Sequence, residues 1–162
     1  MKNILLPSLI SLFLLACNNK KADEPVPKMK PAGPPVQTYY IWQSNLDDST
    51  GKLVFMPALP IPPDSLQPGL VVTLLNKTNA ENGFTNKIRL VFEKISGDTV
   101  YLKIPDATYL TQQMGSSGPR VFLSGLVYTL TGLDGINHVN LDFEEGDHAG
   151  PGTYSRESFK DE

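Results

Sequence analysis

The stretch Val121-Phe-Leu-Ser-Gly-Leu-Val-Tyr-Thr-Leu-Thr131, followed by His138-Val-Asn-Leu-Asp-Phe143, decides the fold. In its first part, apolar residues recur at i, i+3, i+4 and i+7, the spacing that gathers side chains on one face of a helix. These residues are Leu123, Leu126, Val127 and Leu130. Pro119 suits the first turn, Ser116 or Ser117 could cap it, and Gly132 and Gly135 could end the helix.

The second part of this stretch has the period of a strand. Three apolar residues alternate with polar ones, as in a strand buried on one face. The apolar set is Val139, Leu141 and Phe143, and the polar set is His138, Asn140 and Asp142. We therefore predict a unit of helix, glycine-marked turn and strand that ends in an acidic corner.

The chain before this unit predicts further strands and helices. The aromatic run 39–42 and the short apolar run 53–56 favour strands, and the prolines 57, 60, 62 and 63 favour an irregular crossing. A leucine-rich face from Asp64 to Asn76 indicates a helix, and a polar loop should follow over 77–86. Alternation around Ser96-Gly97-Asp98 predicts a hairpin over 88–104, and a short helix should cover 107–114. The fold class is α+β, a small mixed or antiparallel sheet with helices packed on one face.

The N-terminus has the composition of a secretory signal. Lys2 precedes a short apolar run that ends at Leu14-Leu15-Ala16-Cys17, which resembles the lipobox of bacterial lipoproteins. The resemblance implies that Cys17 carries acyl chains such as palmitate, which would anchor the protein to a membrane. Cys17 is also the single cysteine, so disulfides and multi-thiolate metal sites are excluded. We expect a signal peptide over 1–16, a proline-rich tether over 17–37, one domain over 38–159 and a tail over 160–162.

The region from the predicted helix to the last strand resembles a known family. Val127-Tyr128-Thr129-Leu130, a glycine-containing turn, and a strand centred on Val139 are similar to the end of the GerMN domain of sporulation and germination lipoproteins. The resemblance covers roughly Tyr39 to Phe143. It implies a non-catalytic module of the bacterial cell envelope, periplasmic or surface-exposed, reminiscent of ring-building motifs. It brings no catalytic residue and no cofactor.

Polar residues gather where the last strand ends. The set comprises Asp142, Glu144, Glu145, Asp147 and His148, and the next loop adds Tyr154 and Arg156. Tyrosine and arginine are enriched in binding hot spots, so we interpret the seven residues as a candidate partner-binding surface. The alternative for Tyr154 is packing of the loop on the sheet edge. No metal site is predicted, because the spacing matches no calcium loop and no second histidine lies nearby.

A formal net charge of −3 without basic clusters argues against nucleic-acid binding. The favoured function is a lipid-anchored envelope module that binds a protein or cell-wall partner and is not an enzyme. One alternative is a metal-dependent or hydrolytic envelope enzyme using Glu144, Asp147 and His148. Another is a carbohydrate-binding module in which Tyr39, Tyr40 and Trp42 stack on sugars.

Overall fold

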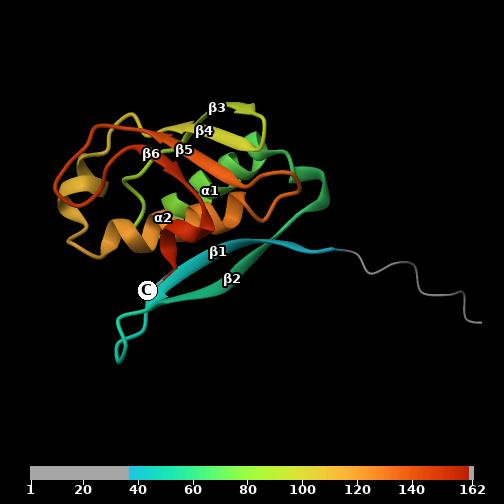
Figure 1. Ribbon diagram of the computed structural model, residues 1–162. Helices are drawn as coiled ribbons and strands as arrows, with labels where there is room; N and C mark the ends of the chain where they lie inside the picture. Colours follow the sequence, from blue (N-terminus) through green and yellow to red (C-terminus); the bar gives the residue numbers. More distant parts are fainter. Residues whose placement is uncertain (1–36, 161–162) are drawn as a thin grey trace, which may run out of the picture. The chain divides into compact units, whose positions relative to one another are not determined.

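The computed structural model describes residues 37–160, which form three layers: a mixed sheet, a pair of helices and a two-stranded hairpin (Figure 1). The predicted signal peptide 1–16, the lipidation site Cys17 and the tether up to residue 36 lie outside the described residues, as do residues 161–162.

The mixed sheet has four strands in the order β3-β4-β5-β6. These are β3 (Val91–Ser96), β4 (Thr99–Lys103), β5 (His138–Asp142) and β6 (Gly152–Tyr154). β4 and β5 run parallel in the middle, and both edge strands are antiparallel to their neighbours. The inward residues of the central strands, Val100, Leu102, Val139 and Leu141, are buried. The predicted alternation and the α+β class are confirmed.

Two helices lie against one face of this sheet, α1 (Pro68–Glu81) and α2 (Gly118–Leu130). Three short helical segments complete the domain: η1 (Pro63–Ser65), η2 (Tyr109–Gln113) and η3 (Arg156–Phe159). The four apolar residues predicted on the inner face of α2 are all buried. None of the described helices is both long enough and apolar enough to span a bilayer.

The ends of α2 differ in part from the prediction. Ser117 is the N-cap residue, but its side chain makes no capping hydrogen bond. Gly135 has the expected left-handed conformation, with φ of +77°, whereas Gly132 is not among the glycines with positive φ. At the C-terminus of α2, the Arg156 guanidinium donates a hydrogen bond to the Tyr128 carbonyl at 3.2 Å and so satisfies one of the last carbonyls of the helix.

α1 is displaced along the sequence from its predicted position. It begins at Pro68 instead of Asp64, because Pro63–Ser65 forms a separate turn of 3-10 helix. It continues to Glu81, so the first half of the predicted loop is helical. Asn76 lies inside the helix and bonds Leu90 twice, donating to its carbonyl at 2.7 Å and accepting from its N–H at 2.8 Å. This pair fixes the start of β3 against α1.

The first two strands form a separate hairpin, β1 (Tyr39–Leu46) and β2 (Leu53–Ile61). The predicted irregular crossing is wrong for residues 57–61, because Pro57 and Pro60 lie within β2. Prolines are tolerated there because β2 is an edge strand. Pro57 is opposite Trp42, whose N–H points away from β2 and donates to Thr129 at 2.8 Å.

A seam of small and polar residues joins β1 to α2. Ser44 Oγ lies 2.6 Å from Ser124 Oγ and donates to the Val121 carbonyl at 2.6 Å. Gly125 lets the strand approach closely, because a Cβ at this position would lie 3.0 Å from the Trp42 carbonyl oxygen. The hairpin is therefore held against α2 by hydrogen bonds and close backbone contact as well as by apolar packing.

Candidate functional site

The polar residues predicted to bind a partner at the end of β5 are exposed, and their side chains do not gather into one cluster. Asp142 forms an ion pair with Lys103 at 3.3 Å. The Asp142 side chain is 59% exposed and the Lys103 side chain is 50% exposed. His148 is held through its backbone N–H, which donates to the Thr111 carbonyl at 3.1 Å. The carboxylates of Glu144, Glu145 and Asp147 are likewise at the surface. Within residues 37–160, no group of three His, Cys, Asp or Glu side chains could hold a metal ion.

The two hot-spot residues of the next loop make contacts inside the domain. The Tyr154 ring stacks on Phe159 with centroids 5.9 Å apart, its hydroxyl donates to the Gly150 carbonyl, and burial raises the pKa of Tyr154. Arg156 Nε donates to Thr131 at 2.9 Å, in addition to its bond with Tyr128. The loop thus folds back on the sheet edge, the alternative left open by the sequence, and both side chains have a structural role there.

The three aromatic residues of the sugar-platform alternative are half-buried. Tyr39 donates to Asp134 Oδ2 at 2.7 Å, and this hydrogen bond raises the pKa of Tyr39. Tyr40 and Trp42 form an edge-to-face pair with ring centroids 6.5 Å apart. They lie edge to face and offer no continuous flat stacking surface.

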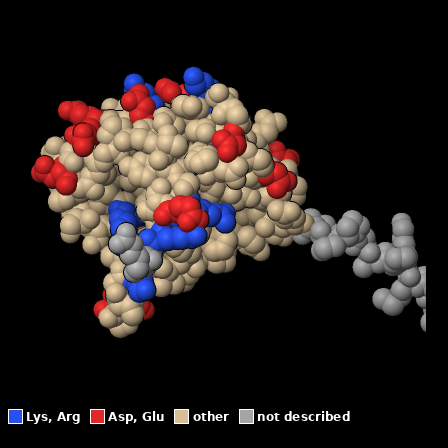
Figure 2. Space-filling model, in the orientation of Figure 1, with Lys and Arg blue, Asp and Glu red and all other residues tan. Residues whose placement is uncertain are grey.

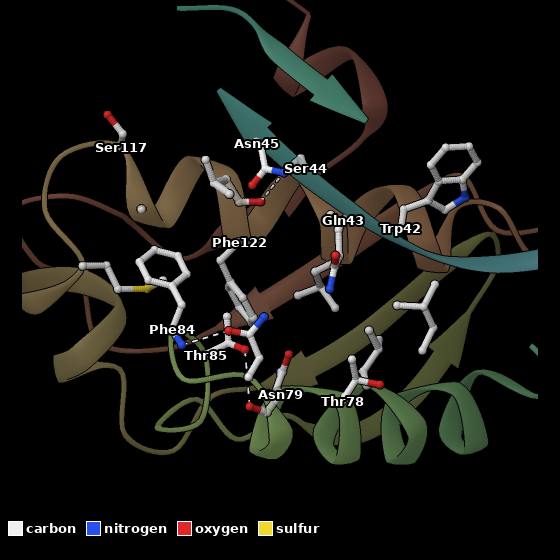
Figure 3. A pocket seen from close by; sticks show the side chains of 18 of the residues that line it. Trp42, Gln43, Ser44, Asn45, Thr78, Asn79, Phe84, Thr85, Ser117 and Phe122 are labelled. Atoms are coloured by element: carbon white, nitrogen blue, oxygen red, sulfur yellow. Dashed lines mark hydrogen bonds between the residues drawn. The ribbon is translucent and has the colours of Figure 1, made fainter. Parts of the chain in front are cut away.

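A pocket of about 560 Å³ lies between β1, α1 and α2 (Figure 3). This volume is within the range of about 300–1,000 Å³ that small-ligand sites occupy. Its apolar lining comes from α1, α2 and the segments next to them: Leu75, Phe84, Leu90, Met114, Phe122 and Leu126. Its polar lining includes the amides of Gln43, Asn45, Asn79 and Asn82.

None of the described residues that line this pocket is acidic, basic, a histidine or a cysteine. In Figure 2, the acidic side chains of the face shown are dispersed over the molecule, and several basic side chains gather in a band near the hairpin, with acidic atoms among them. The pocket lining therefore offers neither an acid nor a base, and a serine in it has no histidine partner.

Asn79 carries a polar group that the fold does not satisfy. The residue is 8% exposed. Asn79 Nδ2 is a buried donor without a hydrogen-bond partner among the described residues, and no other side-chain nitrogen or oxygen there shares this state. Leaving a buried donor unpaired costs about 1–3 kcal/mol. Native folds retain few such groups, so this one needs an explanation.

Apolar side chains extend beyond the mouth of the pocket. The register of the hairpin pairs Gln43 with Met56 and Asn45 with Val54, so these side chains lie next to each other on one face of the hairpin. Met56 and Val54 are 46% and 44% exposed, and Phe84, at the opposite wall, is 43% exposed. The pocket thus opens between apolar surfaces.

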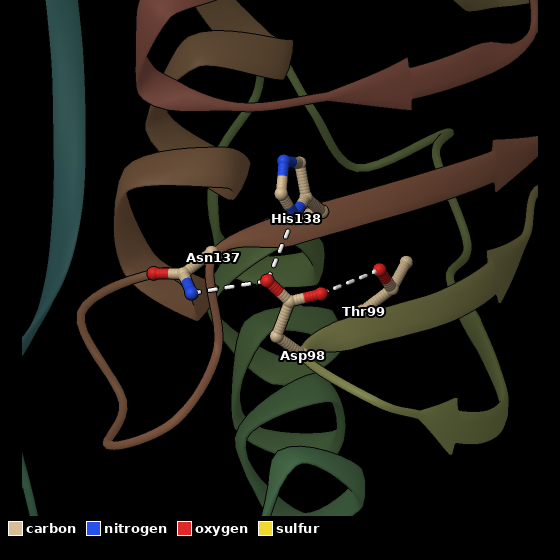
Figure 4. Close-up of polar contacts among 4 residues, drawn as sticks. All are labelled: Asp98, Thr99, Asn137 and His138. Atoms are coloured by element: carbon tan, nitrogen blue, oxygen red, sulfur yellow. Dashed lines mark hydrogen bonds and ion pairs between the residues drawn. The ribbon is translucent and has the colours of Figure 1, made fainter.

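A second polar cluster joins the β3–β4 turn to the start of β5 (Figure 4). Asp98 Oδ2 accepts from Asn137 Nδ2 at 3.0 Å and lies 3.2 Å from His138 Nδ1, and the Asn137 bond is the main reason why the pKa of Asp98 is lowered. The Asp98 carbonyl also accepts from the N–H groups of Asn137 and His138. This cluster is partly exposed and ties two strands together, which is a structural role.

In the comparison with family models, residues 38–147 match the family described as "Germane: Sporulation and spore germination". The chain belongs to the Germane family. This match covers more than half of the chain and confirms the resemblance inferred from the last helix and strand. It ends at Asp147, so β6 and η3 lie beyond it. Searches of curated proteins and of solved structures gave no match.

The Germane match indicates a module related to sporulation or germination. The sequence does not single out Asn79 and Phe84, because it predicts a polar loop over residues 77–86. Gln43 is also not singled out, because the aromatic residues beside it give the stronger signal. The signal that could have found Asn79 is its place one turn after Leu75 on the inner face of a longer α1, where an amide is unusual.

Proposed function

We propose that this Germane-family chain is a lipid-anchored lipoprotein of the bacterial cell envelope whose domain is a non-catalytic binding or assembly module. The pocket between β1, α1 and α2 carries the proposal. It combines an apolar floor, a few polar groups and an unpaired buried donor, the composition of a ligand site. Its lining has no group for general acid–base catalysis, which favours binding over chemistry.

The anchor is proposed from the sequence around Cys17. Acylation of Cys17 would leave a proline-rich tether of about twenty residues before the domain, which at about 3.1 Å per residue reaches roughly 60 Å. Cys17→Ser should move the protein from the membrane to the soluble fraction, and globomycin should cause unprocessed precursor to accumulate. Unchanged fractionation and processing under both treatments would refute the anchor.

The binding function is tested by blocking the pocket. In Figure 3 the Gln43 side chain points from β1 toward the pocket. Gln43→Trp places a large ring there at an exposed strand position, where tryptophan is tolerated. Thr73→Trp is the matched control, because Thr73 is exposed on α1 and does not line the pocket. Crosslinking and co-purification from native membranes should recover a specific partner with the wild type and the control, and lose it with Gln43→Trp.

Recovery of the same proteins with Gln43→Trp would place the binding surface elsewhere. A second set of variants, Glu144→Ala, Asp147→Ala and His148→Ala, tests the exposed corner at the end of β5 in the same experiment. Loss of the partner only with that set would favour the surface predicted from sequence over the pocket.

A further inference from the structure

We infer that the pocket between β1, α1 and α2 recognises an uncharged, extended peptide segment, inserts one large apolar side chain of that segment, and donates a hydrogen bond from Asn79 to its backbone carbonyl. The inference rests on the proposed binding function and names the ligand class of the same site.

The floor of the pocket selects an apolar group. Its deep lining is aliphatic, aromatic or thioether, from Leu75, Leu90, Met114, Phe122 and Leu126. All five side chains are buried. A Leu, Met or Phe side chain transferred there from water gains about 1.5–3 kcal/mol. A hydroxyl or a charge in the same place would lose its hydration without finding partners.

The unpaired donor selects an acceptor. Asn79 projects from the inner face of α1, one turn after Leu75, so an acceptor must lie next to the apolar group that fills the floor. A backbone carbonyl has this position relative to its own side chain. The Asn79 backbone carbonyl is already engaged with the Thr85 hydroxyl, so the side chain alone remains for a ligand.

The rim selects an extended chain without charge. Gln43 and Asn45 are exposed amides at the mouth, and each supplies both donors and acceptors, as peptide units require. Met56 and Val54 lie beside them across the hairpin, so apolar contacts continue outside the pocket. A ligand that uses this whole surface must be longer than a small molecule. No lining residue among those described could pair with a charge on it.

Two other ligand classes fit less well. A glycan brings a hydroxyl on almost every carbon, whereas the deep lining offers apolar side chains. A fatty acid matches the floor but leaves Asn79 without an acceptor at that depth, and its carboxylate finds no cation in the lining.

The test titrates the full chain with acetylated, amidated octapeptides that contain one central Leu, Met or Phe among Ser, Thr, Asn and Gly. Matched peptides carry Ser at the centre, or two Glu or two Lys beside it. Chitotetraose and decanoate are the probes for the other two ligand classes. Fluorescence anisotropy gives affinity by competition with a labelled peptide, and nuclear magnetic resonance follows the Asn79 side-chain amide.

We expect the uncharged apolar peptides to bind at least tenfold more tightly than the serine and charged controls, and to shift the Asn79 amide signal. Asn79→Leu should weaken binding about tenfold, which corresponds to about 1.4 kcal/mol, the size of one hydrogen bond. The same variant should raise the melting temperature of the free protein, because it removes the unpaired donor. Asn79→Ala, with the smaller side chain, should also lose affinity, whereas Thr73→Trp should bind as the wild type does.

Tighter binding of chitotetraose or decanoate than of any peptide would overturn the inference, and so would unchanged affinity in both Asn79 variants. A lower melting temperature of Asn79→Leu would indicate that the amide is already satisfied in the free protein, which also contradicts it. If the peptides fail while Gln43→Trp still loses the envelope partner, the peptide inference falls and the proposed binding function stands.

Discussion

Thr129 offers the sharpest test of how the hairpin is attached. It is 1% exposed on α2, and its hydroxyl makes two bonds of 2.8 Å. It accepts from the Trp42 N–H of β1 and donates to the Gly125 carbonyl one turn earlier in its own helix. Thr129→Val keeps the shape and removes the hydroxyl, so the Trp42 N–H loses its partner.

The expected loss of stability follows from these contacts. The Gly125 carbonyl keeps its helical bond, so the cost comes mainly from the unpaired Trp42 N–H, about 1–3 kcal/mol. In a domain of this size, each kcal/mol lowers the melting temperature by about 4 °C, which gives a decrease of about 4–12 °C. Chemical denaturation monitored by Trp42 fluorescence measures both the free energy of unfolding and its denaturant dependence.

The matched control is Thr73→Val. The Thr73 hydroxyl makes the same kind of bond to the carbonyl four residues earlier, Gly69 at 3.1 Å, but Thr73 is exposed and contacts no other element by hydrogen bond. Its substitution should change stability by less than about 0.5 kcal/mol. If the two variants lose equal stability, or Thr129→Val loses none, the bond to Trp42 does not hold the hairpin and the reasoning is wrong.

Three further predictions concern the core, the end of α2 and the hairpin turn. Leu110→Ala should cost about 2–5 kcal/mol in denaturant unfolding, because Leu110 is fully buried and leaves a cavity; a cost below 1 kcal/mol would contradict its place in the core. Arg156→Ala should cost about 0.5–1 kcal/mol, since the cation lies at the helix C-terminus, and Arg156→Lys should restore part of it. Hydrogen bonds from Ser49 and Thr50 lower the pKa of Asp47 from 3.8 to about 2. The ionised Asp47 carboxylate therefore stabilises the folded state fully above about pH 4, and this stabilisation is lost as pH falls through 2. Asp47→Asn should therefore differ from the wild type in melting temperature at pH 5 and converge with it near pH 2; a constant difference would contradict the shift.

The parts of the fold with strict periodicity were predictable from sequence. Val139 and Leu141 alternate in a strand that is buried on one face, and the face of α2 follows from its apolar spacing. At the start of α1 two local signals compete, and only one of them agrees with the structure. Asp64 and Gln67 have the spacing of a capping box, yet Pro68 begins the helix, because proline suits its first position.

The candidate site was less predictable than the fold. Exposed acids at the end of β5 stand out in the sequence, whereas the pocket is lined by residues from β1, α1, the following loop and α2, far apart along the chain. The one local signal for Asn79 is its place one turn after Leu75, and this signal depends on α1 continuing to Glu81, beyond the helix predicted from sequence. The burial of Asn79 results from the packing of α1 under β1 and α2, which no short sequence window contains.

The proline at position 57 has a consequence for how this protein meets other chains. The Trp42 N–H points toward α2 and away from β2, so Trp42 and Pro57 form a pair without hydrogen bonds between them. The backbone nitrogen of Pro57 therefore faces the outer edge of β2, and proline has no N–H to donate there. An incoming strand therefore cannot complete a regular ladder along that edge. The hairpin is protected against edge-to-edge aggregation on its outer side, while its inner edge is covered by α2. A partner must approach the hairpin through side chains, across its face.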